Sequence, residues 1–303
     1  MTGQAVDPRT LLMHQVMLGD RVRLQAYDDA LRQTVEPGDV VVDVGAGTLV
    51  LSLLALRHGA RHVYAIEGDP EVAALARVIA ERNGLGGTLT LIQGDARHVA
   101  LPEKADVIVS EMMGNLGPEE EMAEVVAAVA RRNLKPSGRI VPRRVQTRLQ
   151  AIQFDGEGWG VWSEDFWGRS LSAVQDHAPS AAQLHFFARD PVRLSAPAIV
   201  ADAALGAVAA GEREEVRLEI VAPGTLHAIV GSFAATLADG VRLSNLPSYP
   251  GCNWAVWVWP LRHTEVRPGM VVRARLQRPD DVRDVAAWRL DCGIAQADPV
   301  SVR

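Results

Sequence analysis

The chain has 303 residues, of which 48% are hydrophobic, which is enough to bury the cores of two domains. It has no apolar run long enough to span a membrane and no export signal at its start, so we expect a cytoplasmic protein. The net charge of -6 disfavours nucleic acid or an anionic membrane as partner and favours a cationic one. The two cysteines, Cys252 and Cys292, lack a metal-ligand spacing, so we predict no metal site.

In the first half, apolar runs with strand character alternate with helical patterns. Predicted strands cover residues 40–44, 62–67, 89–92 and 105–109, and a predicted helix runs from Pro70 to Asn83. Strands separated by helices predict an α/β domain with a Rossmann-like parallel sheet, which binds its ligand at the carboxyl ends of the strands.

The second half has a different character. It contains all seven tryptophans, and apolar and polar residues alternate near Val216 and Val272 as in half-buried antiparallel strands. We therefore predict a first domain over residues 1–142 and a smaller β domain over residues 143–303. The segment from about 156 to 198 is rich in aromatic residues and shows no helical or strand periodicity, so we expect it to pack on another surface.

A glycine turn follows the first predicted strand, at Asp43-Val44-Gly45-Ala46-Gly47. The dinucleotide fingerprint would place a third glycine where this chain has Val50, and this disfavours a cofactor with a pyrophosphate. S-adenosylmethionine has no phosphate and needs only close backbone approach. Glu67 ends the next predicted strand, where a carboxylate accepts from both ribose hydroxyls. We predict that Asp43, Gly45, Gly47 and Glu67 bind this cofactor.

The third predicted strand is followed by Gly94-Asp95-Ala96. An acid at this place accepts from the amino group of an adenine, so we add Asp95 and Ala96 to the predicted cofactor site. Each feature is common by itself, and their order and spacing together favour an adenosine cofactor.

Paired acids follow the fourth predicted strand, in the segment S-E-M-M-G-N-L-G-P-E-E-E-M from Ser110 to Met122. This segment resembles, at unchanged length, the double-glutamate loop of protein arginine N-methyltransferases, with Glu111 and Glu120 at the two glutamate positions. A guanidinium is a poor nucleophile because it stays protonated, and two carboxylates can hold it and leave electron density on the nitrogen that faces the methyl group. Taken alone, the three consecutive acids also suit the start of a solvated helix.

The resemblance extends to other parts of the chain. Residues 14–23 match the family's H-x-x-M-L-x-D-x-x-R helix, which implies that Arg23 pairs with the carboxylate of the cofactor, and Met122 is implied to contact the cofactor. The resemblance also implies a class I methyltransferase domain, a β-barrel-like second domain, a dimerisation arm over about 156–198 and a homodimer. The implied residues for the acceptor are Glu111, Glu120, Met17, Asn115, Asn253 and Trp254.

Departures from the family gather on the acceptor side. The family's T-H-W loop reads Cys252-Asn253-Trp254 here, so an amide replaces the histidine that would pair with Asp20. Met112 and Asn115 replace a tryptophan and a tyrosine, and Leu49 replaces a glycine. Lysine is nearly absent, as is typical of a GC-rich bacterium. We therefore expect a bacterial enzyme for free arginine or another small guanidine, similar to arginine methyltransferases of natural-product pathways.

Three alternatives remain open at this stage. In the first, the acceptor is an arginine of a protein. In the second, the enzyme methylates a hydroxyl or amine of another small molecule. In the third, the chain is a non-catalytic scaffold that binds the cofactor. A nucleic-acid adenine methyltransferase is disfavoured, because Ser110-Glu111-Met112-Met113 is not a D/N-P-P-Y/F motif.

Overall fold

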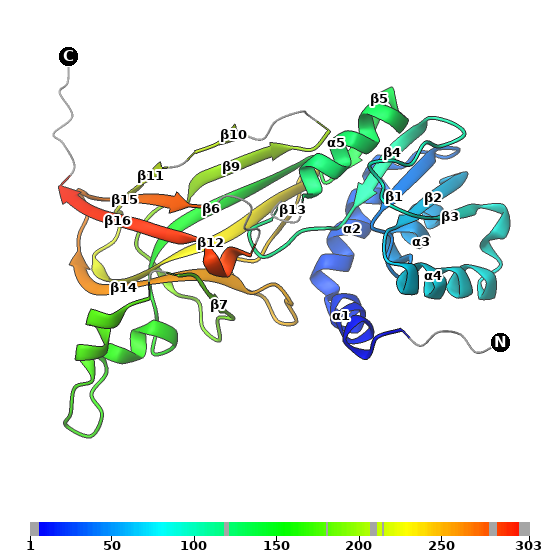
Figure 1. The fold of residues 1–303 in the computed structure, drawn as a ribbon. Coiled ribbons are helices and arrows are strands. Elements are labelled where there is room, and N and C mark those ends of the chain that lie inside the picture. Colours follow the sequence, from blue (N-terminus) through cyan, green and yellow to red (C-terminus); the bar gives the residue numbers. More distant parts are fainter. Residues whose placement is uncertain are drawn as a thin grey trace, which may run out of the picture.

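The computed structural model describes residues 6–117, 121–179, 181–206, 211–213, 215–278 and 284–296. Figure 1 shows two halves side by side, one of helices around parallel strands and the other of long antiparallel strands. The α-helices are α1 (Pro8–Gly19), α2 (Arg21–Thr34), α3 (Val50–Arg57), α4 (Pro70–Arg82) and α5 (Met122–Asn133), and the 3-10 helices are η1 (Leu85–Gly87), η3 (Gly158–Ser163), η4 (Ser172–His177) and η5 (Val285–Ala287).

The first half contains a five-stranded parallel sheet in the order β3-β2-β1-β4-β5. Its strands are β1 (Val40–Val44), β2 (His62–Glu67), β3 (Leu89–Gln93), β4 (Ala105–Ser110) and β5 (Leu134–Val141). Val41 and Ile108 are fully buried, as expected for strands covered on both faces. The predicted strands and the predicted helix are confirmed; Asp69 caps α4 by accepting from the backbone amide of Val72 at 3.0 Å.

The second half contains two antiparallel sheets. The larger has eight strands, with β10-β9-β6-β12-β14-β7 as its main path, and the smaller has the order β11-β15-β16. The strands are β6 (Arg144–Gln153), β7 (Gln183–His185), β8 (Val192–Arg193), β9 (Ala198–Ala204), β10 (Gly211–Glu212), β11 (Glu215–Glu219), β12 (Gly224–Ala238), β13 (Val241–Ser244), β14 (Val256–Val266), β15 (Met270–Gln277) and β16 (Arg289–Gln296). Trp259 and Val272 belong to one core that joins the two sheets. Among the described strands, the main path does not close on itself into a complete barrel.

The segment expected to pack on another surface forms η3 and η4 and leads into β7. It protrudes from the antiparallel half at the lower left of Figure 1. The indole of Trp159 donates to the carbonyl of Leu261 at 2.7 Å, and Arg262 and Asp176 form an ion pair at 3.1 Å, so β14 supports it. Trp167 is 95% exposed, and its ring lies 6.4 Å from that of its neighbour Phe166.

Helix α2 lies between the two halves and contacts β5 as well as β12 and β13. Tyr27 and Leu31 on this helix are fully buried. Residues on its first turns therefore reach both the end of the parallel sheet and the loops of the antiparallel sheet. In the described part of the chain, no helix is both long and apolar enough to cross a membrane.

Candidate active site

The glycine turn brings backbone close to its neighbours in two places. Gly45 and Gly47 have φ values of 73° and 51°, in the left-handed region that favours glycine. A Cβ on Gly45 would lie 3.0 Å from Cγ of Met112, and a Cβ on Gly47 would lie 2.9 Å from Cε1 of His14. The turn thus leaves room for close approach to its backbone only while both residues are glycine.

A pocket of about 70 Å³ lies over this turn. Its lining includes Met17 of α1, Arg23 of α2, both glycines of the turn and Glu111. Predicted cofactor and acceptor residues therefore meet in one place. The pocket is small in this structure, and α1 forms one of its walls. Helix α1 has no buried residue.

The acids predicted to bind the cofactor lie at two depths. Glu67 accepts from the backbone amide of Gly47 at 2.8 Å and from that of Asp69 at 2.9 Å, so its carboxylate lies at the turn. Asp43 is fully buried beneath the turn, where the hydroxyl of Ser52 donates to it at 2.6 Å. Burial raises the pKa of Asp43 to about 6. Asp43 therefore supports the turn from below and does not line the pocket.

The loop after β3 carries an ion pair. Arg97 donates to Asp95 at 2.7 Å, and hydrogen bonds from Arg97 lower the pKa of Asp95 to about 2. Arg97 also lies 3.5 Å from a carboxylate oxygen of Glu121, which precedes α5. Ala96 is buried beside this pair, and Met122 is fully buried at the start of α5. Arg97 thus forms an ion pair with Asp95, the acid that the sequence predicts to bind the adenine amino group.

Glu111, the first acid of the pair, faces a guanidinium. Nη1 of Arg23 donates to its Oε2 at 2.5 Å, and the backbone amide of Met113 donates to its Oε1 at 3.2 Å. The side chains of Arg23 and Glu111 are 5% and 14% exposed. The sequence assigns Arg23 to the carboxylate of the cofactor, and the structure shows that Arg23 also holds Glu111. The second acid, Glu120, lies outside the described residues.

Trp254 forms the opposite side of this guanidinium. The guanidinium carbon of Arg23 lies 3.9 Å from the centre of its indole ring, a cation–π contact. The indole nitrogen donates to the carbonyl of Met113 at 2.9 Å, and the ring packs edge-on against Phe233 at 5.0 Å. Trp254 thereby joins the antiparallel half to the loop that carries Glu111.

The two predicted asparagines have different surroundings. One orientation of the Asn253 amide satisfies its neighbours: its oxygen accepts from Nη2 of Arg23, and its nitrogen donates to the carbonyl of Val16 at 3.3 Å. Asn115 is half-buried, and its backbone carbonyl accepts from the amide of Asn245 at 2.8 Å. Asn253 therefore belongs to the cluster around Arg23.

Tyr249 is a member of this cluster that sequence reasoning missed. Its hydroxyl donates to Oδ2 of Asp20 at 2.9 Å. Asp20 is the residue expected to lose its partner because Asn253 replaces a histidine, and Tyr249 supplies a partner. The only signal in the sequence is that Tyr249 lies a few positions before the Cys252-Asn253-Trp254 segment.

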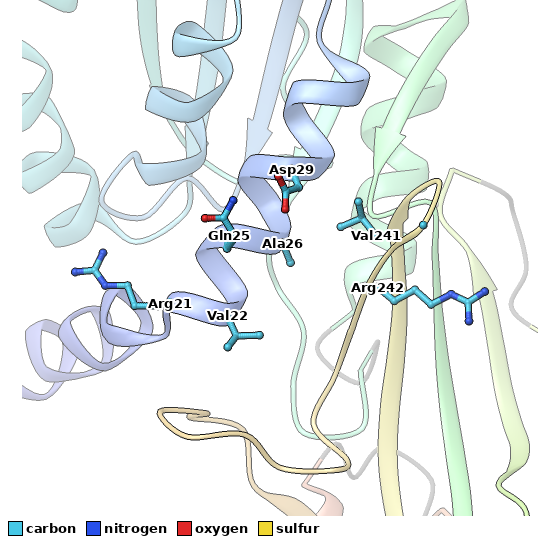
Figure 2. Close-up of a pocket in the computed structure, with 8 residues that line it drawn as sticks. Arg21, Val22, Gln25, Ala26, Asp29, Val241 and Arg242 are labelled. Atoms are coloured by element: carbon cyan, nitrogen blue, oxygen red, sulfur yellow. The ribbon is translucent and has the colours of Figure 1, made fainter.

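A second, open pocket of about 470 Å³ lies on the other side of α2. Figure 2 shows side chains of Val22 and Ala26 on α2, with Val241 and Arg242 of the β12–β13 hairpin across from them. The two pockets share α2 as a wall. Within the described residues, no group of three or more histidine, cysteine or acidic side chains is placed to hold a metal ion.

Comparison with known proteins shows what this chain is similar to. A methyltransferase domain model matches residues 41–138. Protein arginine N-methyltransferase 1 of Schizosaccharomyces pombe is 38% identical over 169 residues, which is 54% of this chain and 49% of that protein. Over these residues the chain is similar in sequence to protein arginine N-methyltransferases. A probable histone-arginine methyltransferase CARM1 of Oryza sativa is 43% identical over 134 residues, 44% of this chain and 25% of that protein. The matches thus span half or less of these relatives.

Solved structures extend the similarity to both halves. Protein arginine methyltransferase 10 of Arabidopsis thaliana has a TM-score of 0.76 at 24% identity, over 95% of this chain and 94% of that one. A chain of the Trypanosoma brucei PRMT1 enzyme-prozyme heterotetrameric complex with AdoHcy has a TM-score of 0.74 at 26% identity, over 94% of this chain and 93% of that one. The expected fold, a Rossmann-like methyltransferase domain with an antiparallel β domain, is confirmed.

Proposed function

We propose that this chain is an S-adenosylmethionine-dependent N-methyltransferase that transfers a methyl group to a guanidinium nitrogen. The observation that carries the proposal is the cluster of Glu111, Arg23 and Trp254 beside the glycine-turn pocket. The carboxylate of Glu111 already binds the guanidinium of Arg23 at 2.5 Å, so the same carboxylate is chemically suited to bind the guanidinium of an acceptor.

The residues present fit the cofactor. The two glycines offer backbone that a Cβ would block, and Glu67 lies at the turn to accept from ribose hydroxyls. The Nε atom of Arg23 is buried without a hydrogen-bond partner among the described residues, which leaves a donor near the place where a carboxylate would bind. When bound, the sulfonium supplies the methyl group.

The protein contributes orientation and electrostatics to the transfer. Arg23 and the amide of Met113 fix Glu111, so its carboxylate is preorganised to accept hydrogen bonds from the acceptor guanidinium. We assign Glu120 as the second carboxylate from its place in the sequence. Two carboxylates that bind one guanidinium draw its positive charge towards the two nitrogens they contact. Electron density is then left on the third nitrogen, which faces the methyl group.

We propose free arginine or a small guanidino metabolite as the acceptor, in a bacterial biosynthetic pathway. The support is that the sequence departs from the family at Met112, Asn115 and Asn253, in segments that the resemblance assigns to the acceptor side. Met112 lies against Gly45, and Asn253 binds Arg23, so both substitutions alter the immediate surroundings of Glu111. The second candidate is an arginine of a protein, favoured by the names of the relatives.

One experiment separates the candidates. The protein is incubated with cofactor labelled in its methyl group and with either free arginine or arginine-rich peptides. Label in free arginine is the expected result, and label in peptide alone would overturn the small-guanidine acceptor. Glu111→Gln and Glu120→Gln should both lose turnover and retain S-adenosylhomocysteine binding. Full activity in both variants would overturn guanidinium methylation by paired acids.

We also propose a homodimer and a domain boundary near Pro142. Helix α1 exposes Leu12 at 57% and Met13 at 61%, and the arm exposes Trp167 at 95%. A twofold arrangement would cover each apolar surface with the other. Light scattering should give a dimer for the natural chain and a monomer for Trp167→Ser, and a monomeric natural chain would overturn the proposal.

A further inference from the structure

The loop between β13 and β14 reaches from the antiparallel sheet to the junction of α1 and α2. Tyr249 donates to Asp20 at 2.9 Å, across 229 positions of sequence. From the same loop, the amide of Asn253 accepts from Nη2 of Arg23, and the ring of Trp254 lies 3.9 Å from the guanidinium carbon of Arg23. Three residues of one short loop therefore hold one junction.

Asp20 connects this loop to the helix. Its carboxylate is fully buried, and a buried carboxylate is costly unless hydrogen bonds satisfy it. Oδ1 accepts from the backbone amide of Arg23 at 2.9 Å and thereby caps the start of α2, while Oδ2 accepts from Tyr249. Burial is the largest cause that raises the pKa of Tyr249, so its hydroxyl keeps its proton and remains a donor.

The first turns of α2 have little other support on one side. Arg21, Val22, Gln25 and Ala26 border the open pocket of about 470 Å³ shown in Figure 2. Because side chains do not fill that pocket, packing there does not fix the helix. The capped start of α2 therefore contributes to the position of Arg23, together with the direct contacts of its guanidinium.

We propose that Tyr249 is a positioning residue of the methyl-transfer site. Its hydroxyl fixes Asp20, Asp20 fixes the start of α2, and α2 holds Arg23 against Glu111. Tyr249 does not line the glycine-turn pocket and acts only through these residues. The role in catalysis rests on the proposed function, whereas the role in fixing α2 does not.

The test compares Tyr249→Phe with Tyr64→Phe. Both variants remove one phenolic oxygen, but among the described residues the hydroxyl of Tyr64 makes only one hydrogen bond, a long one of 3.4 Å to Glu103. In the protein without ligand, we expect Tyr249→Phe to speed hydrogen exchange about tenfold at the first-turn amides of α2, the size of a lost hydrogen bond to a charged group. Tyr64→Phe should leave these rates unchanged.

Binding and kinetics give the second measurement. With Arg23 less well held, Tyr249→Phe should weaken S-adenosylhomocysteine binding about tenfold and lower kcat, while the KM for the acceptor changes less than twofold. A uniform loss of all three constants would indicate general destabilisation and would overturn the positioning role.

Asp20→Asn keeps the test decisive if Tyr249→Phe folds poorly. Its amide oxygen can still accept from the backbone of Arg23, and its nitrogen can donate to the oxygen of Tyr249, so exchange in α2 should stay near the natural rate. If hydrogen exchange in Asp20→Asn is as fast as that expected for Tyr249→Phe, the charge of Asp20 and not its hydrogen bond with Tyr249 fixes α2, and the proposal is overturned. If the natural chain methylates no guanidine, the proposed function fails, and the exchange rates still decide the role of Tyr249.

Discussion

Replacing Arg23 by methionine removes the centre of the candidate site and keeps much of the side-chain volume. Glu111 then loses its 2.5 Å partner while its side chain is 14% exposed, and Trp254 loses its cation. Removing one member of a buried ion pair costs about 3–5 kcal/mol, because the other charge remains buried. We therefore expect Arg23→Met to lower the free energy of unfolding by about 3–5 kcal/mol.

Replacing the acid of the pair is expected to lower the free energy of unfolding by less. Glu111→Gln leaves an amide oxygen that still accepts from Arg23, and the carboxylate of Asp20 remains 3.9 Å from Nε of Arg23. The loss should be about 1–2 kcal/mol, the difference between a charged and a neutral hydrogen bond. The double variant should lose less than the sum of both, because the two residues are in direct contact.

Urea denaturation followed by circular dichroism measures these differences. Arg32→Met is the matched control, because Arg32 lies on the same helix and pairs with Asp29 at 2.6 Å but is 61% exposed. This exposed pair should contribute less than about 1 kcal/mol. Equal losses for Arg23→Met and Arg32→Met, or strict additivity of Arg23→Met with Glu111→Gln, would refute the assignment of a buried, coupled pair.

Three further predictions concern stability. Leu49 has a φ of 68° and a fully buried side chain, so Leu49→Gly should be more stable than Leu49→Ala by about 1 kcal/mol in urea; the reverse order would contradict backbone strain. Asp43 has a pKa raised to about 6, so the folded state binds its proton more tightly and stability falls as pH rises from about 4 to 6. Asp43→Asn should remove that slope from a series of urea titrations, and an unchanged slope would count against it. Burial and the neighbouring His263 lower the pKa of His227 to about 4, so the unfolded state binds its proton more tightly and stability falls as pH drops from about 6.5 to 4. His227→Gln should flatten acid unfolding in this range, and equal acid sensitivity of both proteins would contradict this.

Four strands of the parallel sheet could be predicted because apolar residues dominate them, whereas β5, which contains Lys135, Pro136 and Ser137, was not predicted. β1 is buried at every position, so local composition alone marks it as a strand. Helix α4 was equally clear, because Asp69 and Pro70 give a capped start. Local chemistry decides such elements, and little information from the rest of the fold is needed.

The contacts of the candidate site could not be predicted in the same way. Arg23 and Glu111 are 88 positions apart, and Tyr249 and Asp20 are 229 apart. Sequence patterns placed three of these residues near a site through a family resemblance, but which side chain binds which depends on how the two halves meet. Leu49 illustrates the same limit: its departure from glycine was visible, and its left-handed backbone was not.

Helix α1 connects the proposed cofactor site with the proposed dimer. It forms one wall of the glycine-turn pocket, and its outer surface exposes Leu12 and Met13. A partner that covers these residues would favour one position of α1, and the cofactor would favour a position that leaves the pocket open. If the two positions agree, dimerisation and cofactor binding strengthen each other, and if they differ, each weakens the other, because linkage is reciprocal. Tyr249 is attached to the end of the same helix through Asp20, so the antiparallel half takes part in this balance even though it contributes no residue to the lining of the glycine-turn pocket.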